Sequence, residues 1–257
     1  MNLKVDINCD LGEGFGHFKA GNDNEIMPFI TSANIACGFH AGDPVIIART
    51  VKLAKDNGVS VGAHPGLPDL LGFGRRYMEL SYEELKNTII YQVGVLKIFA
   101  EAADIKLQHV KPHGALYNTA SQSEAHAECI IEAVRLVDSN LVLFALANSK
   151  MAMMASKAGL RVASEVFADR AYNQDGSLVS REIEGSIIND PKLVAERALS
   201  IIKEKKVTAI NNQTVEFKDA HTICVHGDTL NAVEVVKTLK RSLLNSQIDV
   251  KSVGYFV

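Results

Sequence analysis

The sequence predicts a single-domain α/β protein whose seven or eight mostly parallel strands alternate with helices and close into a (β/α) barrel. Three observations predict this fold. The chain has 257 residues, a size that such barrels commonly have. Short runs rich in β-branched residues alternate with helical patterns, and no internal repeat, low-complexity tract or linker divides the chain. We therefore expect one domain over residues 1–257, with an open doubly wound sheet as the alternative fold.

The expected strands are short and spread over the whole chain. In chain order they are residues 4–9, 32–36, 59–63, 107–111, 141–145, 161–166 and 222–225, with a shorter one near 250–252. Most are apolar runs of the length that buried strands have. Because parallel strands need long crossover connections, we expect helices between them.

The helices carry recognisable start and stop signals. Asp43-Pro44 is typical of an N-cap followed by proline at the first helical position, and Gly58 is expected to end that helix. A capping box, Ser81-Tyr82-Glu83-Glu84, begins the next long helix. Asp228 or Thr229 is expected to cap the last long helix.

Composition argues against several classes of function. The net charge of −3, without a basic block, argues against nucleic acid or a membrane surface as a partner. No apolar run reaches the length of a membrane span, and the N-terminal residues lack a signal-peptide core. No Cys-x-x-Cys pair occurs, so we expect reduced, buried cysteines and a cytoplasmic protein. The four cysteines are Cys9, Cys37, Cys129 and Cys224.

Polar residues gather where the expected strands end. In the first strand Asp6, Asn8 and Asp10 alternate and so share one face. The later strand ends carry His40, His64, His113, the group Glu165, Asp169 and Arg170, and finally His226. The strand starts carry no comparable set. Because ligands bind at the carboxyl ends of parallel strands, we expect these residues to line one functional pocket.

The fourth strand shows the same pattern most clearly. His109, Lys111 and His113 are two residues apart and should point the same way. Pro112 ends the strand ladder and Gly114 allows a sharp exit, which places His113 at the mouth of a pocket. The alternative is a pair of core-edge histidines bonded to the backbone, with the lysine reaching solvent.

These residue types suit acid–base chemistry. Carboxylates beside histidines and a lysine can act as general acids and bases on a polar bond. A trio of Asp10, His64 and His113 could instead hold a divalent metal with a position open for water. The sequence lacks a Gly-x-Ser-x-Gly elbow, a phosphate-binding P-loop and a dinucleotide fingerprint. Residue patterns alone thus predict a pocket of hydrolase or lyase type.

Several candidate residues have a second interpretation. Asp10 could cap the turn at residues 11–13, and Arg75-Arg76 could be either an anion-gripping loop or an exposed basic pair. Glu165 and the Asp169-Arg170 pair could orient substrate or form a salt bridge at the rim.

Seven blocks of the sequence resemble the LamB/YcsF family, which supplies the A component of bacterial 5-oxoprolinase. They are residues 6–13 (DINCDLGE), 32–44 (SANIACGFHAGDP), 62–66 (GAHPG), 72–76 (GFGRR), 111–117 (KPHGALY), 165–170 (EVFADR) and 225–228 (VHGD). The matches run in order over nearly the whole chain. One departure is Leu178-Val179-Ser180-Arg181, where the family pattern leads us to expect proline before the arginine.

The resemblance implies a barrel similar to the glycoside hydrolase/deacetylase superfamily and ATP-dependent opening of the lactam of 5-oxoproline (pyroglutamate) to glutamate. It implies partner subunits B and C, which would handle the ATP, in keeping with the missing P-loop. On the matched positions we assign Asp10, His64 and His113 to water and protons, and Lys111 to negative charge developing on oxygen. We assign the substrate's carboxylate and ring amide to Asn8, Glu13, Asn34, His40, Glu165 and Arg170.

Two rival functions stay open on the sequence. One is a stand-alone metal-dependent deacetylase or amidohydrolase that would bind its ion through Asp10, His64 and His113. The other is a non-catalytic scaffold that completes the partner complex. The sequence also leaves open whether a divalent metal is used and whether the chain forms a homo-oligomer.

Overall fold

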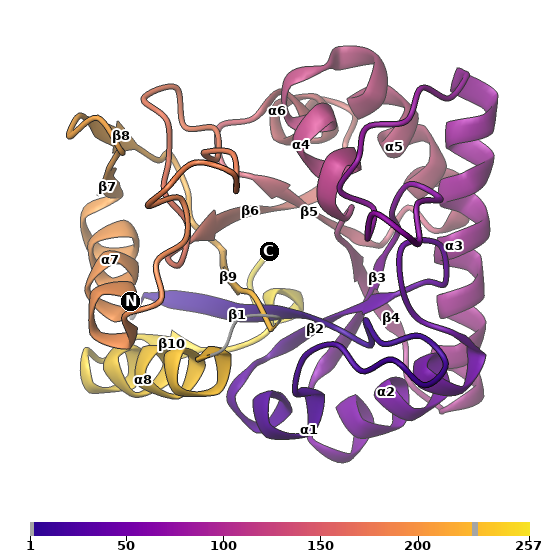
Figure 1. Ribbon diagram of the computed structural model, residues 1–257, viewed down its shortest axis with the longest axis horizontal. Coiled ribbons are helices and arrows are strands. Elements are labelled where there is room, and N and C mark those ends of the chain that lie inside the picture. The colour runs from indigo at the N-terminus through magenta and orange to yellow at the C-terminus, as the bar shows by residue number, and fades with distance from the viewer. Residues whose placement is uncertain (1–2, 228–230) are drawn as a thin grey trace.

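A ring of parallel strands forms the centre of the molecule in the computed structural model, which describes residues 3–227 and 231–257 (Figure 1). The ring consists of β1 (Lys4–Leu11), β2 (Ser32–Ala36), β3 (Ser60–His64), β4 (Leu107–Val110), β5 (Val142–Leu146), β6 (Arg161–Phe167), β9 (Thr222–Val225) and β10 (Asp249–Val250), and a separate hairpin consists of β7 (Lys206–Thr208) and β8 (Thr214–Glu216). The sheet runs β10-β1-β2-β3-β4-β5-β6-β9, and pairing of β1 with β9 closes it into a barrel. This closure confirms the barrel and contradicts an open sheet.

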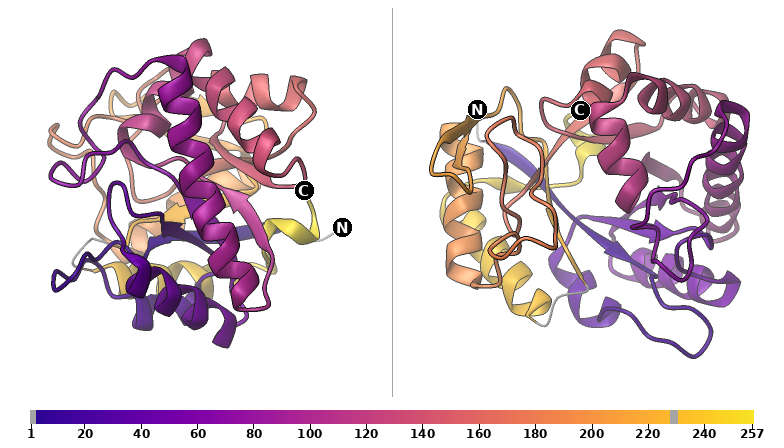
Figure 2. Two further views of the ribbon diagram at one scale, coloured as in Figure 1. Left: turned by 90° about the vertical axis from the view of Figure 1, so that its right-hand side faces the viewer. Right: turned by 45° about the horizontal axis from the view of Figure 1, so that its top comes forward.

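Helices surround this ring of strands (Figure 1). They are α1 (Asp23–Ile26), α2 (Pro44–Asp56), α3 (Tyr82–Ala102), α4 (Gly114–Gln122), α5 (Glu124–Val137), α6 (Lys150–Lys157), α7 (Pro191–Glu204) and α8 (Ala232–Asn245), with 3₁₀ turns η1 (Met27–Phe29) and η2 (Val253–Tyr255). The left view of Figure 2 shows α3 running past the strands as the longest outer element. None of the helices in the described part of the chain combines the length and the apolar character that a bilayer crossing needs.

The predicted strands are confirmed with small shifts at their ends. The second and seventh predicted strands coincide with β2 and β9, and the others differ by one or two residues at an end. The segment predicted near residues 250–252 is β10, which pairs with the start of β1. The antiparallel hairpin of β7 and β8 was not predicted, because three-residue strands leave too short a pattern to recognise.

The predicted helix caps are also confirmed where the structure describes them. The Asp43 side chain accepts hydrogen bonds from the backbone N–H groups of Val45 and Ile46. Ser81 and Glu84 form the reciprocal capping box that begins α3. Helix α2 ends at Asp56, two residues before Gly58. Asp228 and Thr229, expected to cap the last long helix, lie outside the described residues.

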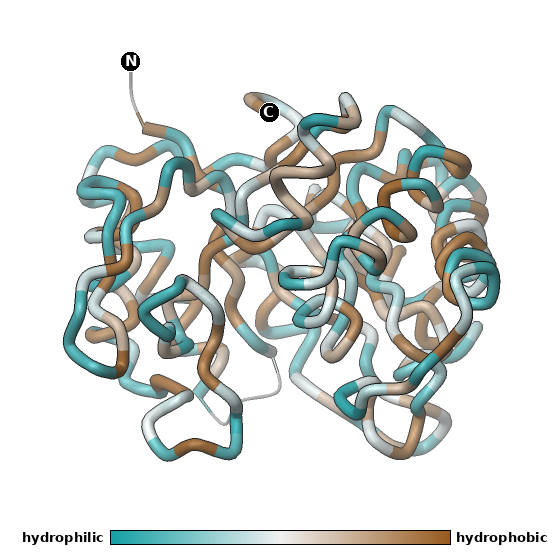
Figure 3. Tube along the Cα trace, turned by 90° about the horizontal axis from the view of Figure 1, so that it is seen from above, coloured by the Kyte–Doolittle hydropathy of each residue, from teal (hydrophilic) through white to brown (hydrophobic). Residues whose placement is uncertain are grey.

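Apolar packing holds the helices to the outside of the barrel. Hydrophilic and hydrophobic residues alternate along the outer helices in Figure 3, as amphipathic helices require. A separate apolar cluster of Val142, Phe144, Ala163 and Val253 joins the 3₁₀ turn near the C-terminus to the starts of β5 and β6. The opposite ends of the strands, which carry the polar residues, are therefore the side where a site can open.

Candidate active site

A cavity of about 560 Å³ lies at the carboxyl ends of the barrel strands. Its lining includes the predicted residues Asp10, Glu13, His64, Lys111, His113 and Arg170. The further side chains that line it include Arg75, Tyr117, Asn118, Gln122, Ser177, Ser180, Arg181, Glu182 and His226. The volume falls within the roughly 300–1,000 Å³ of small-molecule sites.

A buried lysine between two carboxylates forms the floor of the cavity. Lys111 Nζ lies 2.9 Å from Asp10 Oδ1 and 3.1 Å from Glu165 Oε1. Burial alone would raise the pKa of Asp10, but His64 and Lys111 outweigh it and hold that pKa well below its usual value. Burial would likewise lower the pKa of Lys111, and its anionic neighbours raise it well above the usual value. The lysine is therefore charged and can stabilise negative charge in the cavity.

Two histidines lie edge to face beside Asp10. His64 Nδ1 is 2.7 Å from the Lys111 carbonyl oxygen, and His113 Nε2 is 2.8 Å from the Phe73 carbonyl oxygen. Each carbonyl can only accept, so each neutral ring uses its one proton there. The remaining nitrogens, His64 Nε2 and His113 Nδ1, face each other at 2.9 Å. Two lone pairs at that distance require a shared proton or a bound cation.

A proton shared by the two histidines would carry positive charge, and the Asp10 carboxylate beside them can balance it. Asp10 Oδ2 lies 3.3 Å from His64 Nε2. Without that proton the histidine pair is a base: it can take a proton from water, hold it between His64 Nε2 and His113 Nδ1 beside the carboxylate, and then give it to a leaving group. The sequence placed these residues together, and the structure gives their spacing.

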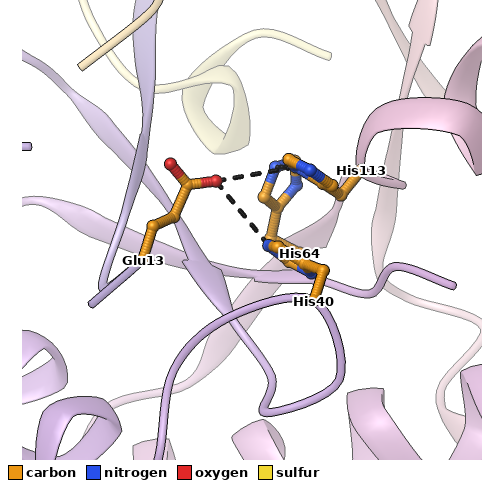
Figure 4. A group of neighbouring side chains, drawn as sticks. All are labelled: Glu13, His40, His64 and His113. Carbon is orange, nitrogen blue, oxygen red and sulfur yellow. Dashed lines mark hydrogen bonds and ion pairs between the residues drawn. The ribbon is translucent and has the colours of Figure 1, made fainter. Parts of the chain in front are cut away.

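A third histidine and a glutamate complete a cluster drawn in Figure 4. The His40 ring stacks on His113 with 3.8 Å between ring centroids. Glu13 Oε1 lies 3.6 Å from His40 Nε2 and from His113 Nδ1. Gly66 and Gly74 make room for these rings, because a Cβ on either would lie within 3 Å of a His40 atom.

The cluster fits a metal ion. One ligand atom from each of Glu13, His40, His64 and His113 lies within 4.8 Å of the others. Both buried ring nitrogens of His40 lack a hydrogen-bond partner among the described residues. Burial and neighbouring histidines hold the pKa values of His40 and His113 well below the usual value, which keeps both rings neutral, as metal ligands must be. This set differs from the predicted trio, because Asp10 groups instead with Cys224 and His226.

Four of the predicted substrate-binding residues lie behind the cavity wall. Asn8, Asn34, His40 and Glu165 are completely buried and are absent from the cavity lining. Asn34 donates to Asp10 Oδ1 at 2.8 Å and to Asn8 Oδ1 at 2.7 Å. Glu165 accepts from the Tyr117 hydroxyl at 2.6 Å. In this structure they contact residues that line the cavity but do not line it themselves.

His109, the first residue of the predicted face on β4, fills the barrel below this layer. Its Nε2 lies 2.8 Å from Asn34 Oδ1, and its ring stacks on Phe144. Gly62 on the neighbouring strand allows this, because a Cβ there would lie 2.0 Å from His109 Nε2. Burial lowers the pKa of His109 to about 3, so the ring is neutral and structural.

Asp169 and His226, both expected at the pocket from their places after strand ends but assigned no catalytic or binding role, form an aspartate–histidine pair at the cavity. Asp169 Oδ2 accepts from the backbone N–H of His226 at 3.0 Å and lies 2.8 Å from His226 Nδ1. The carboxylate thereby fixes the ring orientation and favours a proton on Nδ1. The sequence signal was present, because both residues follow strand ends, but only the fold shows that they touch.

The arginines noted in the sequence have different surroundings. Arg76 turns away from the cavity and pairs with Asp69, whereas Arg75 lines the cavity with its guanidinium 4.9 Å from the centre of the Phe73 ring. Arg170 donates from Nε to the Ser186 carbonyl at 3.2 Å and from Nη2 to the Val179 carbonyl at 2.5 Å. It therefore holds the segment that carries the family departure at residues 178–181.

Comparison with known proteins gives one consistent answer. The model of the LamB/YcsF family matches residues 5–256. A Campylobacter jejuni subsp. doylei protein, named as the A component of 5-oxoprolinase, is 53% identical over 255 residues, which cover 99% of this chain and 100% of that protein. The crystal structure of a lactam utilization protein from Thermus thermophilus superposes with a TM-score of 0.91 at 46% identity, covering 97% of this chain and 99% of the other.

A more distant likeness concerns the fold alone. A deacetylase determined with its substrate superposes with a TM-score of 0.50 at 15% identity, covering 98% of this chain and 89% of the other. The predicted similarity to deacetylase barrels is thus confirmed at the level of the fold.

Proposed function

The chain belongs to the LamB/YcsF family, and from this membership we propose that it is the lactam-opening subunit of an ATP-dependent 5-oxoprolinase. Its substrate would be 5-oxo-L-proline in an activated form and its product L-glutamate. Partner subunits B and C would handle the ATP, since the sequence has no P-loop. The four buried free thiols support the expected cytoplasmic location.

The observation that carries this proposal is the meeting of Asp10, His64, Lys111 and His113 at one cavity. In the proposed reaction the His64–His113 pair takes a proton from water beside Asp10. The hydroxide forms a bond to the lactam carbonyl carbon, and negative charge on the carbonyl oxygen is stabilised by Lys111. The ring C–N bond then breaks, and the nitrogen leaves with the proton that the histidine pair returns.

The remaining residues would bind and orient the substrate. Glu13 and Arg170 line the cavity, and we assign them to the ring amide and the carboxylate. We assign Asn8, Asn34, His40 and Glu165 to the same task from behind the wall, where they fix Asp10, His113 and Lys111. Their hydrogen bonds to neighbours that line the cavity support this division.

The test is turnover of 5-oxoproline by the complex reconstituted with subunits B and C. His113→Ala and Asp10→Asn should each lower turnover by at least about a thousandfold, because each removes a group that moves or holds the proton. The control is His17→Ala, since His17 is exposed and outside the cavity lining. Near-normal turnover in both cavity variants, with native circular dichroism, would leave a scaffold as the better account.

A second candidate function is metal-dependent hydrolysis of an amide by this chain alone. The two ring nitrogens of His40, which have no hydrogen-bond partner in the described chain, favour it. Glu13, His40, His64 and His113 would hold the ion, which would supply a Lewis acid and an activated water. Calorimetric titration of the isolated chain with Zn²⁺ and Mn²⁺, repeated with His40→Ala, tests this second function. The proposal of a stand-alone enzyme fails if neither ion binds.

A further inference from the structure

One row of residues crosses four neighbouring strands of the barrel and ends at the cavity. Strand pairing sets Asp10 on β1 beside Asn34 on β2. The same row continues with Gly62 on β3 and His109 on β4. Because Gly62 has no side chain, the His109 ring reaches across β3, and its Nε2 lies 2.8 Å from Asn34 Oδ1. The row thus connects His109 to Asp10 through the amide of Asn34.

The orientation of the Asn34 amide follows from its partners. Its Nδ2 lies 2.8 Å from Asp10 Oδ1 and 2.7 Å from Asn8 Oδ1. A carboxylate only accepts hydrogen bonds, so the NH₂ group of Asn34 must face Asp10. Asn8 also presents its oxygen, because its own Nδ2 donates to the Glu165 carboxylate at 2.9 Å. Both hydrogens of the Asn34 amide are therefore used, and its oxygen faces His109.

His109 supplies the donor that this oxygen needs. Burial lowers the pKa of His109 to about 3, so the neutral ring has one N–H group, and the Asn34 oxygen places it on Nε2. Among the hydrogen bonds of residues 3–227 and 231–257, no other donor reaches that oxygen. Both side chains are completely buried. Without the ring the Asn34 oxygen would be a buried acceptor with no donor, and the amide would shift toward another partner.

Asn34 in turn helps to decide which oxygen of Asp10 meets the proton-handling histidines. Asp10 Oδ1 accepts from Asn34 and also from Lys111 Nζ at 2.9 Å. With Oδ1 held from two sides, Oδ2 is the oxygen that lies 3.3 Å from His64 Nε2. A shift of the Asn34 amide would therefore move the carboxylate relative to His64.

We propose that His109 is a positioning residue of the reaction, which holds Asp10 beside His64 through the amide of Asn34. His109 lies below the cavity and is not part of its lining, so it acts only through these neighbours. The inference rests on the proposed function for the reaction that it serves, and it adds to that function a residue outside the cavity.

Two substitutions of similar size separate the hydrogen bond from the packing of the ring. His109→Gln keeps an N–H group that can reach Asn34, whereas His109→Met fills a similar volume without a donor. In the complex reconstituted with subunits B and C, His109→Met should lower kcat for 5-oxoproline by about tenfold or more, because Asp10 is misplaced. Its KM should stay within about threefold, and His109→Gln should keep kcat within about threefold of wild type.

Crystal structures of the isolated full-length chain test the same contact without turnover. In His109→Met the distance between Asp10 Oδ2 and His64 Nε2 should change by about 0.5 Å or more, the tolerance of a catalytic arrangement. In His109→Gln it should stay as in the wild type. Gly62→Ala is a second perturbation, because its Cβ would displace the unaltered His109 ring, and it should reproduce the effects of His109→Met. It replaces His109→Met if circular dichroism shows that His109→Met does not fold.

A double variant tests whether His109 acts through Asn34. In the Asn34→Leu background, His109→Met should lower kcat by less than about a further twofold, because the contact is already lost. The proposal is overturned if the folded variant, His109→Met or Gly62→Ala, turns over within about threefold of wild type. It is also overturned if Asp10 keeps its position in that variant, or if the losses in the double variant multiply.

Failure of the lactam-opening proposal would look different. In that case the wild-type complex would not turn over 5-oxoproline, whereas the crystal structures would still show whether His109 holds Asp10 in place.

Discussion

Replacing Lys111 by methionine tests the electrostatic arrangement of the cavity floor. Lys111 is 3% exposed and its Nζ lies 2.9 Å from Asp10 Oδ1 and 3.1 Å from Glu165 Oε1. Methionine preserves most of the side-chain length but removes the charge. Lys111→Met therefore leaves the two carboxylates without the cation that they share.

The expected cost follows from the burial of this pair. Removing one partner of a buried ion pair destabilises a protein by about 3–5 kcal/mol, because the other charge remains buried. For a chain of this size, about 1 kcal/mol shifts the melting temperature by about 2–4 °C. Lys111→Met should therefore lower the melting temperature by roughly 6–20 °C, measured by calorimetry at about pH 7 and checked by urea unfolding.

The loss of stability in Lys111→Met should also depend on pH. In the wild type Asp10 has a lowered pKa, so its stabilising charge is present above the ordinary carboxyl pKa and is lost only in stronger acid. In Lys111→Met a buried carboxyl binds a proton more readily in the folded state than in the unfolded state. The variant should thus recover part of its stability as pH falls from about 7 to about 5.

A double variant separates stability from chemistry. Lys111→Met with Glu165→Gln removes one of the two carboxylates and should regain at least about 1 kcal/mol over the single variant, yet remain inactive. The reasoning is refuted if Lys111→Met lies within about 1 kcal/mol of the wild type at about pH 7. It is equally refuted if the stability deficit widens at about pH 5.

Three further changes test other parts of the structure. His109 has a pKa lowered to about 3, so the unfolded chain binds its proton first as pH falls below the ordinary histidine value of about 6.5. Between about pH 7 and pH 4.5, the free energy of unfolding of His109→Gln, measured with urea, should therefore rise by about 2.5 kcal/mol relative to that of the wild type. The same pH dependence in both proteins would contradict this. Gly62→Ala should destabilise the protein by about 3 kcal/mol, because its Cβ would clash with the His109 ring. Gly94→Ala, in α3 with open space around it, should stabilise the protein slightly. Urea unfolding measures both effects. Asp169→Asn should lower turnover at least about tenfold and change the proton position on the His226 ring in ¹⁵N NMR spectra, and an unchanged ring spectrum would exclude the orienting role.

Much of the barrel could be predicted because local patterns agree with the final fold. The β2 and β9 segments were located to the residue, and the capping box of Ser81 was read directly from the sequence. The β7–β8 hairpin escaped prediction, since its strands have only three residues each and do not join the barrel. The pairing of these two strands depends on tertiary packing, which three residues of sequence cannot indicate.

Part of the site was also predictable from position along the chain. Asp10, His64, Lys111 and His113 were identified because each lies at the end of a parallel strand, and the structure brings them to one cavity. The same reasoning did not separate residues that line the cavity from those behind it. Glu165 follows the strand pattern as well as Lys111 does, yet it is completely buried.

The sequence by itself determined the alternation of strands and helices and the edge of the barrel at which polar residues collect, because both follow from spacing along one chain. Only the tertiary structure decided which of those residues touch, such as His40 on His113 and Asp169 on His226. The reason is physical. Strand periodicity fixes the direction of a side chain, whereas barrel closure and the paths of the loops fix the distances between side chains of different strands.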